Sequence, residues 1–474
     1  MAETGILVRR SHGSPAMFRY LASYRLYTLA KIGFAAAYLW FVADFLRIHL
    51  AIWQDPLPLL PPASDLVFLG VADLEPILRN TAEWVNAKPA VWALAAFSPM
   101  LAGLYLWGRR RWLQVAVGCG MSFTMIALTS LSGVFNSTAD VWLNYVFLAY
   151  ALAAAVCPAD AWERREPGFS LAKWREDPLL ASSYASLIVI LEFTVYFFAG
   201  INKLVYGWEP WTTGTALQNL AIDSSMRDYL RGIHVPYVVS VALCYVTLAQ
   251  RLIVPFGFFS RRYRLWSALI LGAMHLGYFL LMQVAIFPLI GIASLLIVAP
   301  PRGVAAPLFG RVPSGHPKPV KKLLSLEGAG VRYAGVAMGF FSVWLLLESA
   351  RLAAGSAMAW ENKLMVVPAW RMFADGGATS GNHWRIILQT PQGEVDATDL
   401  SRELLPHLWR DRFYVDLVMH LLLSAEEQGG RGEPDPLLRR LFAATERAYT
   451  DRQLQAHGDP TIYRARFAIE RRPH

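Results

Sequence analysis

The stretch Ser182-Ser-Tyr-Ala-Ser-Leu-Ile-Val-Ile-Leu-Glu-Phe-Thr-Val-Tyr-Phe-Phe-Ala199 decides the fold of this chain. Most of its residues are apolar, and Glu192 is the only charged residue among them. The hydrocarbon core of a bilayer is about 30 Å thick and an α-helix rises about 1.5 Å per residue, so a run of this length crosses most of that core. The stretch therefore predicts a membrane-spanning helix.

Further apolar runs, several of them short or interrupted by polar residues, recur on both sides of this stretch. With it, they occupy residues 32–52, 90–107, 112–132, 141–157, 182–199, 236–257, 265–284, 286–299 and 331–350. The seventh and eighth runs meet at the turn around Phe287 and Pro288, so they also fit one long broken segment. The pattern predicts a polytopic α-helical membrane protein with about nine transmembrane helices.

The composition supports the membrane class and argues against a nucleic-acid partner. Hydrophobic residues make up 55% of the 474 residues, and the mean hydropathy is +0.34. The net charge of +9 comes from clusters of Lys and Arg between the apolar runs, which is typical of membrane topology signals. The cysteines Cys119, Cys157 and Cys244 are far apart, and no metal-ligand or nucleotide-binding motif is present, so neither cofactor is predicted.

The distribution of Lys and Arg also predicts the orientation. Basic clusters at 9–31, 109–111, 164–175, 261–264 and 302–322 alternate with loops that contain few basic residues, at 79–88, 133–140 and 203–231. Because positive residues accumulate in cytoplasmic loops, we expect a bacterial inner-membrane protein with a cytoplasmic N-terminus and an extracytoplasmic C-terminus. The expected domains are an N-terminal cytoplasmic segment (1–31), a transmembrane domain (32–350) and a C-terminal outer domain (351–474).

The C-terminal domain has the pattern of a small α+β fold on the outer face. Trp384 to Thr390 alternates like a strand, Pro391-Gln-Gly-Glu394 has turn residues and a returning strand begins at Val395, so a hairpin is predicted. Helical periodicity follows at Leu404–Ala425 and Pro436–Tyr449, and a last strand is expected at Thr461–Glu470.

Ionisable residues inside the apolar runs indicate a site, because charges at membrane depth are costly. Glu192 and Lys203 are close to three helical turns apart, so they share one face of a helix about 16 Å apart along its axis. Lys203 either extends to the interface or acts as a base at the rim of an apolar cavity. His275 either packs in the core or binds a ligand and relays a proton.

Other charged residues have simpler interpretations. Asp44 with Arg47, and Glu348 with Arg351, lie three residues apart on predicted helices and form self-neutralising pairs. The segment Trp370-Arg-Met-Phe-Ala374 follows the last span and mixes aromatic with cationic side chains. This pattern is typical of an anchor in the headgroup region.

Three motifs indicate a relationship to known proteins. The first is Tyr196-Phe-Phe-Ala-Gly-Ile-Asn-Lys-Leu204, followed by Trp211-Thr-Thr-Gly214 and Ala216-Leu217. The second runs from Met274-His275 to Ile286-Phe287-Pro288, and the third is Trp370-Arg-Met-Phe-Ala374 followed by a strand, a glycine turn and Val395-Asp396. In order and spacing they resemble the HTTM superfamily of vitamin K-dependent gamma-carboxylase-like membrane proteins, over about residues 20–450.

The resemblance implies roles for two residues. Lys203 matches the lysine that acts as the base in vitamin K hydroquinone oxygenation, and His275 matches a histidine of the quinone-reacting pocket. The chain differs from the carboxylase at Thr138–Tyr145, which contains no histidine where the carboxylase has an Asn-His pair. We expect a lipid-accessible cavity that opens outward near Lys203, with Glu192, Trp211, Trp370 and Phe373 binding the cofactor.

The most specific hypothesis is therefore quinone- or lipid-linked redox chemistry, of the lyase or oxidoreductase kind, with a quinone or hydroquinone as cofactor and membrane lipids as partners. A second hypothesis is a non-catalytic membrane subunit that organises a membrane or periplasmic protein partner. A third is lipid modification or transfer by His275. Only the first uses Lys203 and His275 together.

Overall fold

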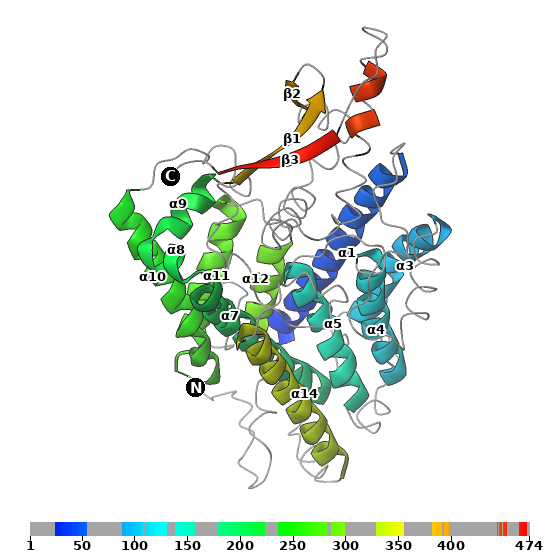
Figure 1. The fold of residues 1–474 in the computed structure, drawn as a ribbon. Coiled ribbons are helices and arrows are strands. Elements are labelled where there is room, and N and C mark those ends of the chain that lie inside the picture. Colours follow the sequence, from blue (N-terminus) through cyan, green and yellow to red (C-terminus); the bar gives the residue numbers. More distant parts are fainter. Residues whose placement is uncertain are drawn as a thin grey trace.

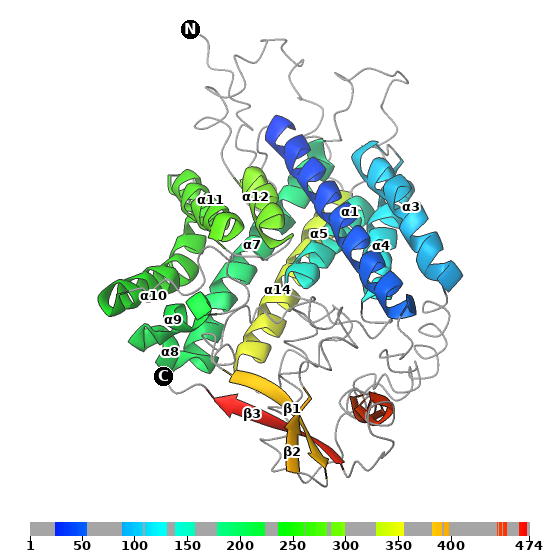
Figure 2. The ribbon, with the colours of Figure 1, turned by 90° about the horizontal axis from the view of Figure 1, so that it is seen from above.

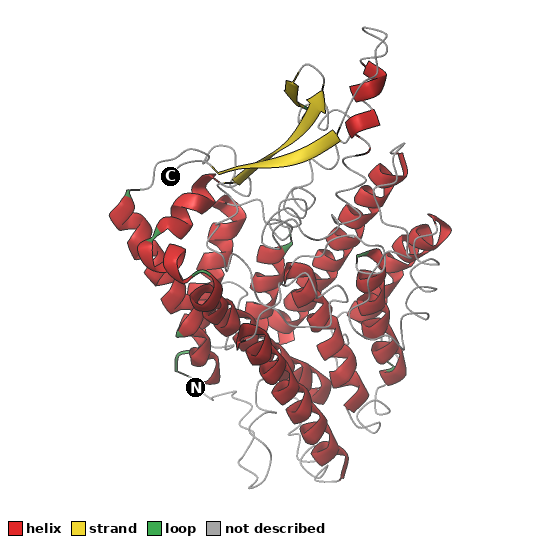
Figure 3. Cartoon of the chain, in the orientation of Figure 1, coloured by secondary structure: helices red, strands yellow, loops and turns green. Residues whose placement is uncertain are grey.

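The computed structural model describes residues 24–54, 88–107, 110–129, 138–156, 178–222, 236–260, 262–281, 286–298, 329–354, 382–390, 393–397, 443, 445–447, 449–452 and 464–471. Within these ranges the chain is mostly helical, and its three strands form one small sheet near the C-terminus (Figures 1 and 3).

A helix lies at each of the nine predicted apolar runs. These helices are α1 (Tyr24–Gln54), α3 (Lys88–Trp107), α4 (Arg111–Leu128), α5 (Thr138–Val156), α7 (Pro178–Tyr206), α10 (Tyr237–Leu252), α11 (Arg264–Leu281), α12 (Phe287–Val298) and α14 (Ala329–Ala354). A 3-10 helix, η7 (Val254–Phe259), extends α10, and two short helices, α8 (Trp208–Thr213) and α9 (Thr215–Ile222), follow α7. The predicted break before Phe287 is confirmed, because α11 and α12 are separate helices.

Seven segments of the described chain are long and apolar enough to cross a membrane. They comprise α1, α3, α4, α5, α7, α10 with η7, and α11. Helix α12 has 12 residues, which gives it a length of about 18 Å, shorter than the hydrocarbon core of about 30 Å. Helix α14 is longer but is not one of the seven, so the nine helices are confirmed as helices and nine crossings remain a prediction.

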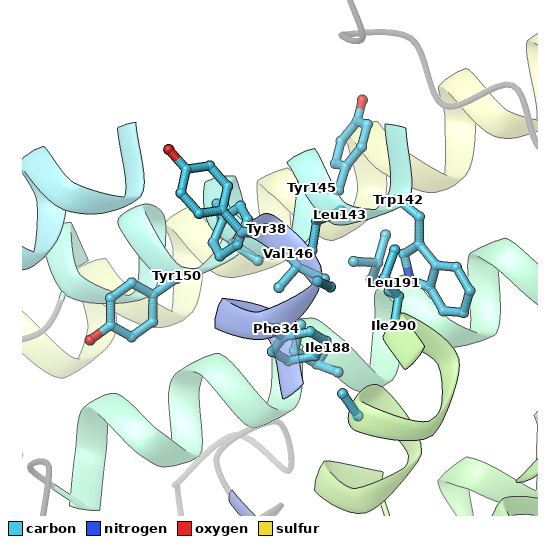
Figure 4. Packing of buried hydrophobic residues seen from close by; sticks show 14 of the residues in the cluster. Phe34, Tyr38, Trp142, Leu143, Tyr145, Val146, Tyr150, Ile188, Leu191 and Ile290 are labelled. Atoms are coloured by element: carbon cyan, nitrogen blue, oxygen red, sulfur yellow. The ribbon is translucent and has the colours of Figure 1, made fainter. Parts of the chain in front are cut away.

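The core of the bundle lies between α1, α5, α7 and α12. Figure 4 shows Phe34, Trp142, Ile188 and Ile290, one from each of these helices, packed together with their neighbours. Among the seven candidate spans, α5 and α7 are the most buried and α10 and α11 the least. The α5 and α7 helices are therefore the most enclosed of these spans.

The outer helices expose large apolar side chains. On α14 the exposed residues Val336, Phe340, Val343 and Leu347 recur every three or four positions. Such a stripe covers one helix face, which is the arrangement expected of a helix that contacts lipid. The predicted ion pairs at its end and in α1 are confirmed, because Arg351 lies 2.9 Å from Glu348 and Arg47 lies 3.0 Å from Asp44.

The sheet has the order β2-β1-β3, and both pairings are antiparallel. Strand β1 (Asn382–Thr390) and β2 (Gly393–Asp396) form the predicted hairpin, and β3 (Arg464–Arg471) is the predicted last strand. Residues 445–447 and 449–452 are helical, which agrees with the end of the second predicted helix. The predicted helix Leu404–Ala425 lies outside the described residues.

The sheet lies at one end of the bundle, the end at which α8 and α9 also lie (Figures 1 and 2). Leu388 of β1 is fully buried and belongs to the same apolar core as the helices. The segment that follows Lys203 and the C-terminal strands are therefore at the same end of the molecule.

Candidate functional site

One buried face of α7 contains the polar residues of the site. Glu192, Tyr196, Gly200 and Lys203 are spaced by four, four and three residues, which places them in one row along the helix. The side chains of Glu192, Tyr196 and Lys203 are each at most 2% exposed. The predicted shared face of Glu192 and Lys203 is thus the inner face of α7.

Glu192 lies at the N-terminal end of this row and contacts helix α5. The indole Nε1 of Trp142 donates a hydrogen bond to its Oε1 over 3.1 Å. The second oxygen, Oε2, is buried and has no hydrogen-bond partner in the described part of the chain. The hydroxyl groups of Ser294 and Tyr196 lie beside the carboxyl group. Glu192 therefore retains capacity to accept a further hydrogen bond.

Tyr196 connects α7 to His275 of α11. Its hydroxyl oxygen lies 2.6 Å from Nε2 of His275, and both side chains are completely buried. Nδ1 of His275 has no hydrogen-bond partner among the described residues. Because a tyrosine hydroxyl and a neutral imidazole can each donate or accept, a proton can be exchanged between the two groups.

Aromatic rings and the backbone of α12 surround the imidazole. The ring centroid of His275 lies 4.9 Å from that of Phe287 and 5.9 Å from that of Trp142. A Cβ atom on Gly291 would lie 2.3 Å from Nε2 of His275, so only glycine allows α12 to approach the ring this closely. The packing holds the imidazole in one position beside Tyr196.

Arg251 of α10 completes a cluster that the sequence analysis did not identify. Its guanidinium carbon lies 5.3 Å from the ring centroid of Tyr196 and its Nη2 donates to the hydroxyl of Tyr278 over 3.1 Å. The absence of a side chain at Gly200 makes this approach possible, because a Cβ there would lie 2.9 Å from Cβ of Arg251. We call Trp142, Glu192, Tyr196, Arg251 and His275 the α7 polar cluster.

Lys203 lies in a second, smaller cluster on the same face of α7. Its Nζ lies 4.5 Å from the ring centroid of Trp211 in α8, which is cation–π geometry. Trp211 packs with Ala216, Cys244 and Leu248 of the adjoining helices. The structure therefore brings the predicted residues Lys203 and Trp211 together, and it brings Glu192 and His275 together through Tyr196.

A third buried group lies among α1, α3, α4 and α5. Nζ of Lys31 donates to the hydroxyl of Tyr150 over 3.1 Å and lies 4.4 Å from the ring centroid of Tyr105. The hydroxyl of Tyr150 in turn donates to Oε1 of Gln114. Lys31 belongs to the basic cluster 9–31 of the sequence. In the structure its amine contacts the aromatic side chains of Tyr105 and Tyr150.

The remaining predicted site residues, Trp370 and Phe373, lie outside the described residues. The roles proposed for Lys203, His275, Glu192 and Trp211 stay predictions. Arg251 and Tyr278 were missed although a sequence signal existed, because an arginine inside the predicted span 236–257 is an ionisable group at membrane depth.

The seven apolar helices and their buried polar clusters define the class of the protein, an integral membrane protein of the α-helical type. The family model described as the HTTM domain matches residues 84–302, from the segment just before α3 to just after α12. This part of the chain is therefore an HTTM domain, and the resemblance to the HTTM superfamily is confirmed there. Comparisons with curated proteins and with solved structures each gave no match.

Proposed function

We propose that this HTTM protein binds a quinone, or a lipid with a similar head group, beside the α7 polar cluster and exchanges protons with it during redox chemistry. The observation that carries the proposal is the 2.6 Å contact between the Tyr196 hydroxyl and Nε2 of His275 inside an apolar bundle. Ionisable groups at membrane depth are costly and are found at proton relays and ligand sites, which supports a functional role for this contact.

The unused hydrogen-bonding capacity of the cluster fits a quinone. Nδ1 of His275 and Oε2 of Glu192 are buried without partners in the described chain. A quinone has two oxygens that accept hydrogen bonds, and its reduced form has two hydroxyl groups that donate them. The imidazole and the carboxyl group therefore match the two forms, and Trp211 offers an aromatic surface beside Lys203.

Each residue of the site has a proposed role that follows from its position. When bound, a hydroquinone supplies two electrons and two protons. Lys203 is the base in this proposal, because its amine lies at the edge of an apolar cluster over Trp211. His275 and Tyr196 orient the ligand and relay a proton between Nε2 and the hydroxyl group. Glu192 accepts a hydrogen bond at Oε2.

The proposed setting is a bacterial inner membrane with nine crossings, a cytoplasmic N-terminus and the strands on the periplasmic side. The charge pattern supports this orientation, since all five basic clusters fall on one side in that arrangement. The position of the sheet at the same end of the bundle as α8 and α9 is consistent with a site that opens on the outer side.

The test is to purify the protein in mild detergent and to identify its bound quinones and lipids by mass spectrometry. We expect a stoichiometric quinone in the wild type, with at least about a tenfold loss in Lys203→Met and His275→Gln. Two matched control variants should keep the bound quinone. Lys31→Met removes another buried lysine amine, and His49→Gln changes another buried histidine, whose Nε2 contacts the Leu128 carbonyl.

The same experiment separates the alternative, a non-catalytic subunit that organises a protein partner. In that case wild type and variants would contain the same bulk lipids and no quinone, and a partner protein would co-purify in stoichiometric amount. That result would end the redox proposal.

A further inference from the structure

Arg251 is a charged residue enclosed within the helical bundle. Its side chain is 1% exposed and lies on α10, within the candidate span Tyr237–Phe259. Removing a guanidinium group from water has a large free-energy cost unless a partner compensates for it. The guanidinium carbon of Arg251 lies 5.3 Å from the ring centroid of Tyr196 and 5.9 Å from that of Tyr278.

Most of the hydrogen-bonding capacity of this guanidinium is unused. Nη2 donates to the Tyr278 hydroxyl, but Nε and Nη1 are buried and have no partner within the described ranges. The ion pairs found there are Asp44–Arg47 and Glu348–Arg351, and neither involves Arg251. Because the Tyr278 hydroxyl accepts from Arg251, its own proton is available to donate.

This arrangement has the features of an oxyanion site. Arginine presents planar N–H donors that match a carboxylate or a phosphate, and a tyrosine hydroxyl beside them adds a further donor. Arg251 is itself part of the α7 polar cluster, and His275 lies close enough to it to interact with its charge. An anion between these groups would compensate the buried positive charge.

The surroundings indicate where such an anion comes from. Ile253, two residues after Arg251, is 68% exposed, and Phe279 and Leu280, which follow Tyr278, are 50% and 52% exposed. Helices α10 and α11 are the least buried of the candidate spans. The apolar surface on both sides of the site therefore faces the lipid, which favours a ligand with an acidic head group and an apolar chain.

We propose that Arg251 and Tyr278 bind an oxyanion inside the bundle, the carboxylate or phosphate head group of a membrane amphiphile. The quinone proposal rests on Lys203, Glu192, Tyr196 and His275 and gives no role to Arg251 or Tyr278, so the two proposals use different residues around the same cluster. Binding of an acidic amphiphile does not require a quinone, so each proposal can fail without the other.

The experiment compares ligands that differ in charge but share an apolar chain. Delipidated wild-type protein in neutral detergent is titrated with a long-chain fatty acid, the fatty alcohol of equal length, phosphatidic acid and inorganic phosphate, and its thermal unfolding is followed. We expect the acid or the phosphatidic acid to raise Tm while the alcohol does not. Protection by inorganic phosphate alone would support the oxyanion site and assign it a water-soluble ligand.

The variants test whether Arg251 is responsible. Arg251→Leu should weaken the response to the acidic ligand at least about tenfold, since charge-assisted hydrogen bonds are lost. Tyr278→Phe removes one hydroxyl group and should weaken the response to the acidic ligand less. This variant replaces Arg251→Leu as the test if Arg251→Leu does not fold. Arg262→Leu, which changes an exposed arginine before α11, should have no effect. Equal protection by acid and alcohol, or an unchanged preference in both Arg251→Leu and Tyr278→Phe, would overturn the proposal.

Discussion

The backbone of Gly291 in α12 lies against the imidazole of His275 in α11, so closely that a Cβ atom at Gly291 would be 2.3 Å from Nε2. The same nitrogen is the one that contacts the Tyr196 hydroxyl. The backbone of α12 therefore packs against the imidazole, and Tyr196 of α7 forms a hydrogen bond with it.

Gly291→Ala should displace the imidazole and break its contact with Tyr196. Overpacking of a closely packed interior lowers the free energy of unfolding by about 1–3 kcal/mol. Thermal unfolding in detergent measures the loss, and quinone retention should fall with it. Gly277→Ala on α11 is the control, because nothing lies within 4 Å of a Cβ there. Equal effects of the two substitutions would contradict the account.

Tyr196→Phe removes the hydroxyl group that contacts His275 and leaves Nε2 without this partner. A buried polar group left unpaired costs about 1–3 kcal/mol. Tyr38→Phe is a matched control, since the Tyr38 hydroxyl bonds the Ser98 hydroxyl in the core, 3.0 Å away. Both variants should lose stability, measured by chemical denaturation, but only Tyr196→Phe should lose bound quinone. Loss of quinone in both would indicate a general effect of destabilisation.

A double-mutant cycle tests the contact between Lys203 and Trp211. The cation–π geometry predicts a coupling free energy of about 0.5–2 kcal/mol between Lys203→Met and Trp211→Leu. The free energies of unfolding of the wild type, both single variants and the double variant measure it. If the two losses add to within about 0.4 kcal/mol, the amine and the indole do not interact in solution.

Leu388→Pro should open the sheet at its central strand. Leu388 pairs with Val395 of β2 and with Ala465 of β3, and proline removes a backbone N–H donor. We expect faster proteolysis between β1 and β3 while the helical bundle stays folded. Glu394→Pro, on the edge strand β2, should have a smaller effect. Similar cleavage of both variants would argue that β1 is not the central strand.

Reporter fusions test whether α12 and α14 cross the membrane. Nine crossings place segment 299–328 on the cytoplasmic side and the segment after β2 on the outer side. Paired reporters, one active only in the cytoplasm and one only outside, should give opposite signals at these positions. The same signal at both would mean that α14 does not cross.

The positions of the helices were predictable because each apolar run produces the same local signal in any tertiary context. The hairpin was predictable for the same reason, since β1, the turn and β2 are adjacent in sequence. The short length of α12 was also visible in the sequence, because the apolar run 286–299 has fewer residues than the roughly 20 that a span needs. The structure confirms it, since α12 has 12 residues.

The contacts of the site were less predictable. Glu192 and Lys203 could be assigned to one face of α7 from their spacing alone. The partners of Glu192 and His275 could not, because Trp142, Tyr196 and Gly291 come from three helices far apart in sequence. Arg251 is a different case, since a charged residue within a predicted span was visible without any structure.

The pairing of β3 with β1 has a consequence for biosynthesis. Roughly 70 residues separate Thr390 from Arg464, and translation at about 5–20 residues per second takes about 4–14 s to produce them. During that interval one edge of β1 is open to any other extended segment. A slow ribosome or a premature stop between the strands would lengthen or fix this exposure, so β1 would remain open to mispairing with another chain.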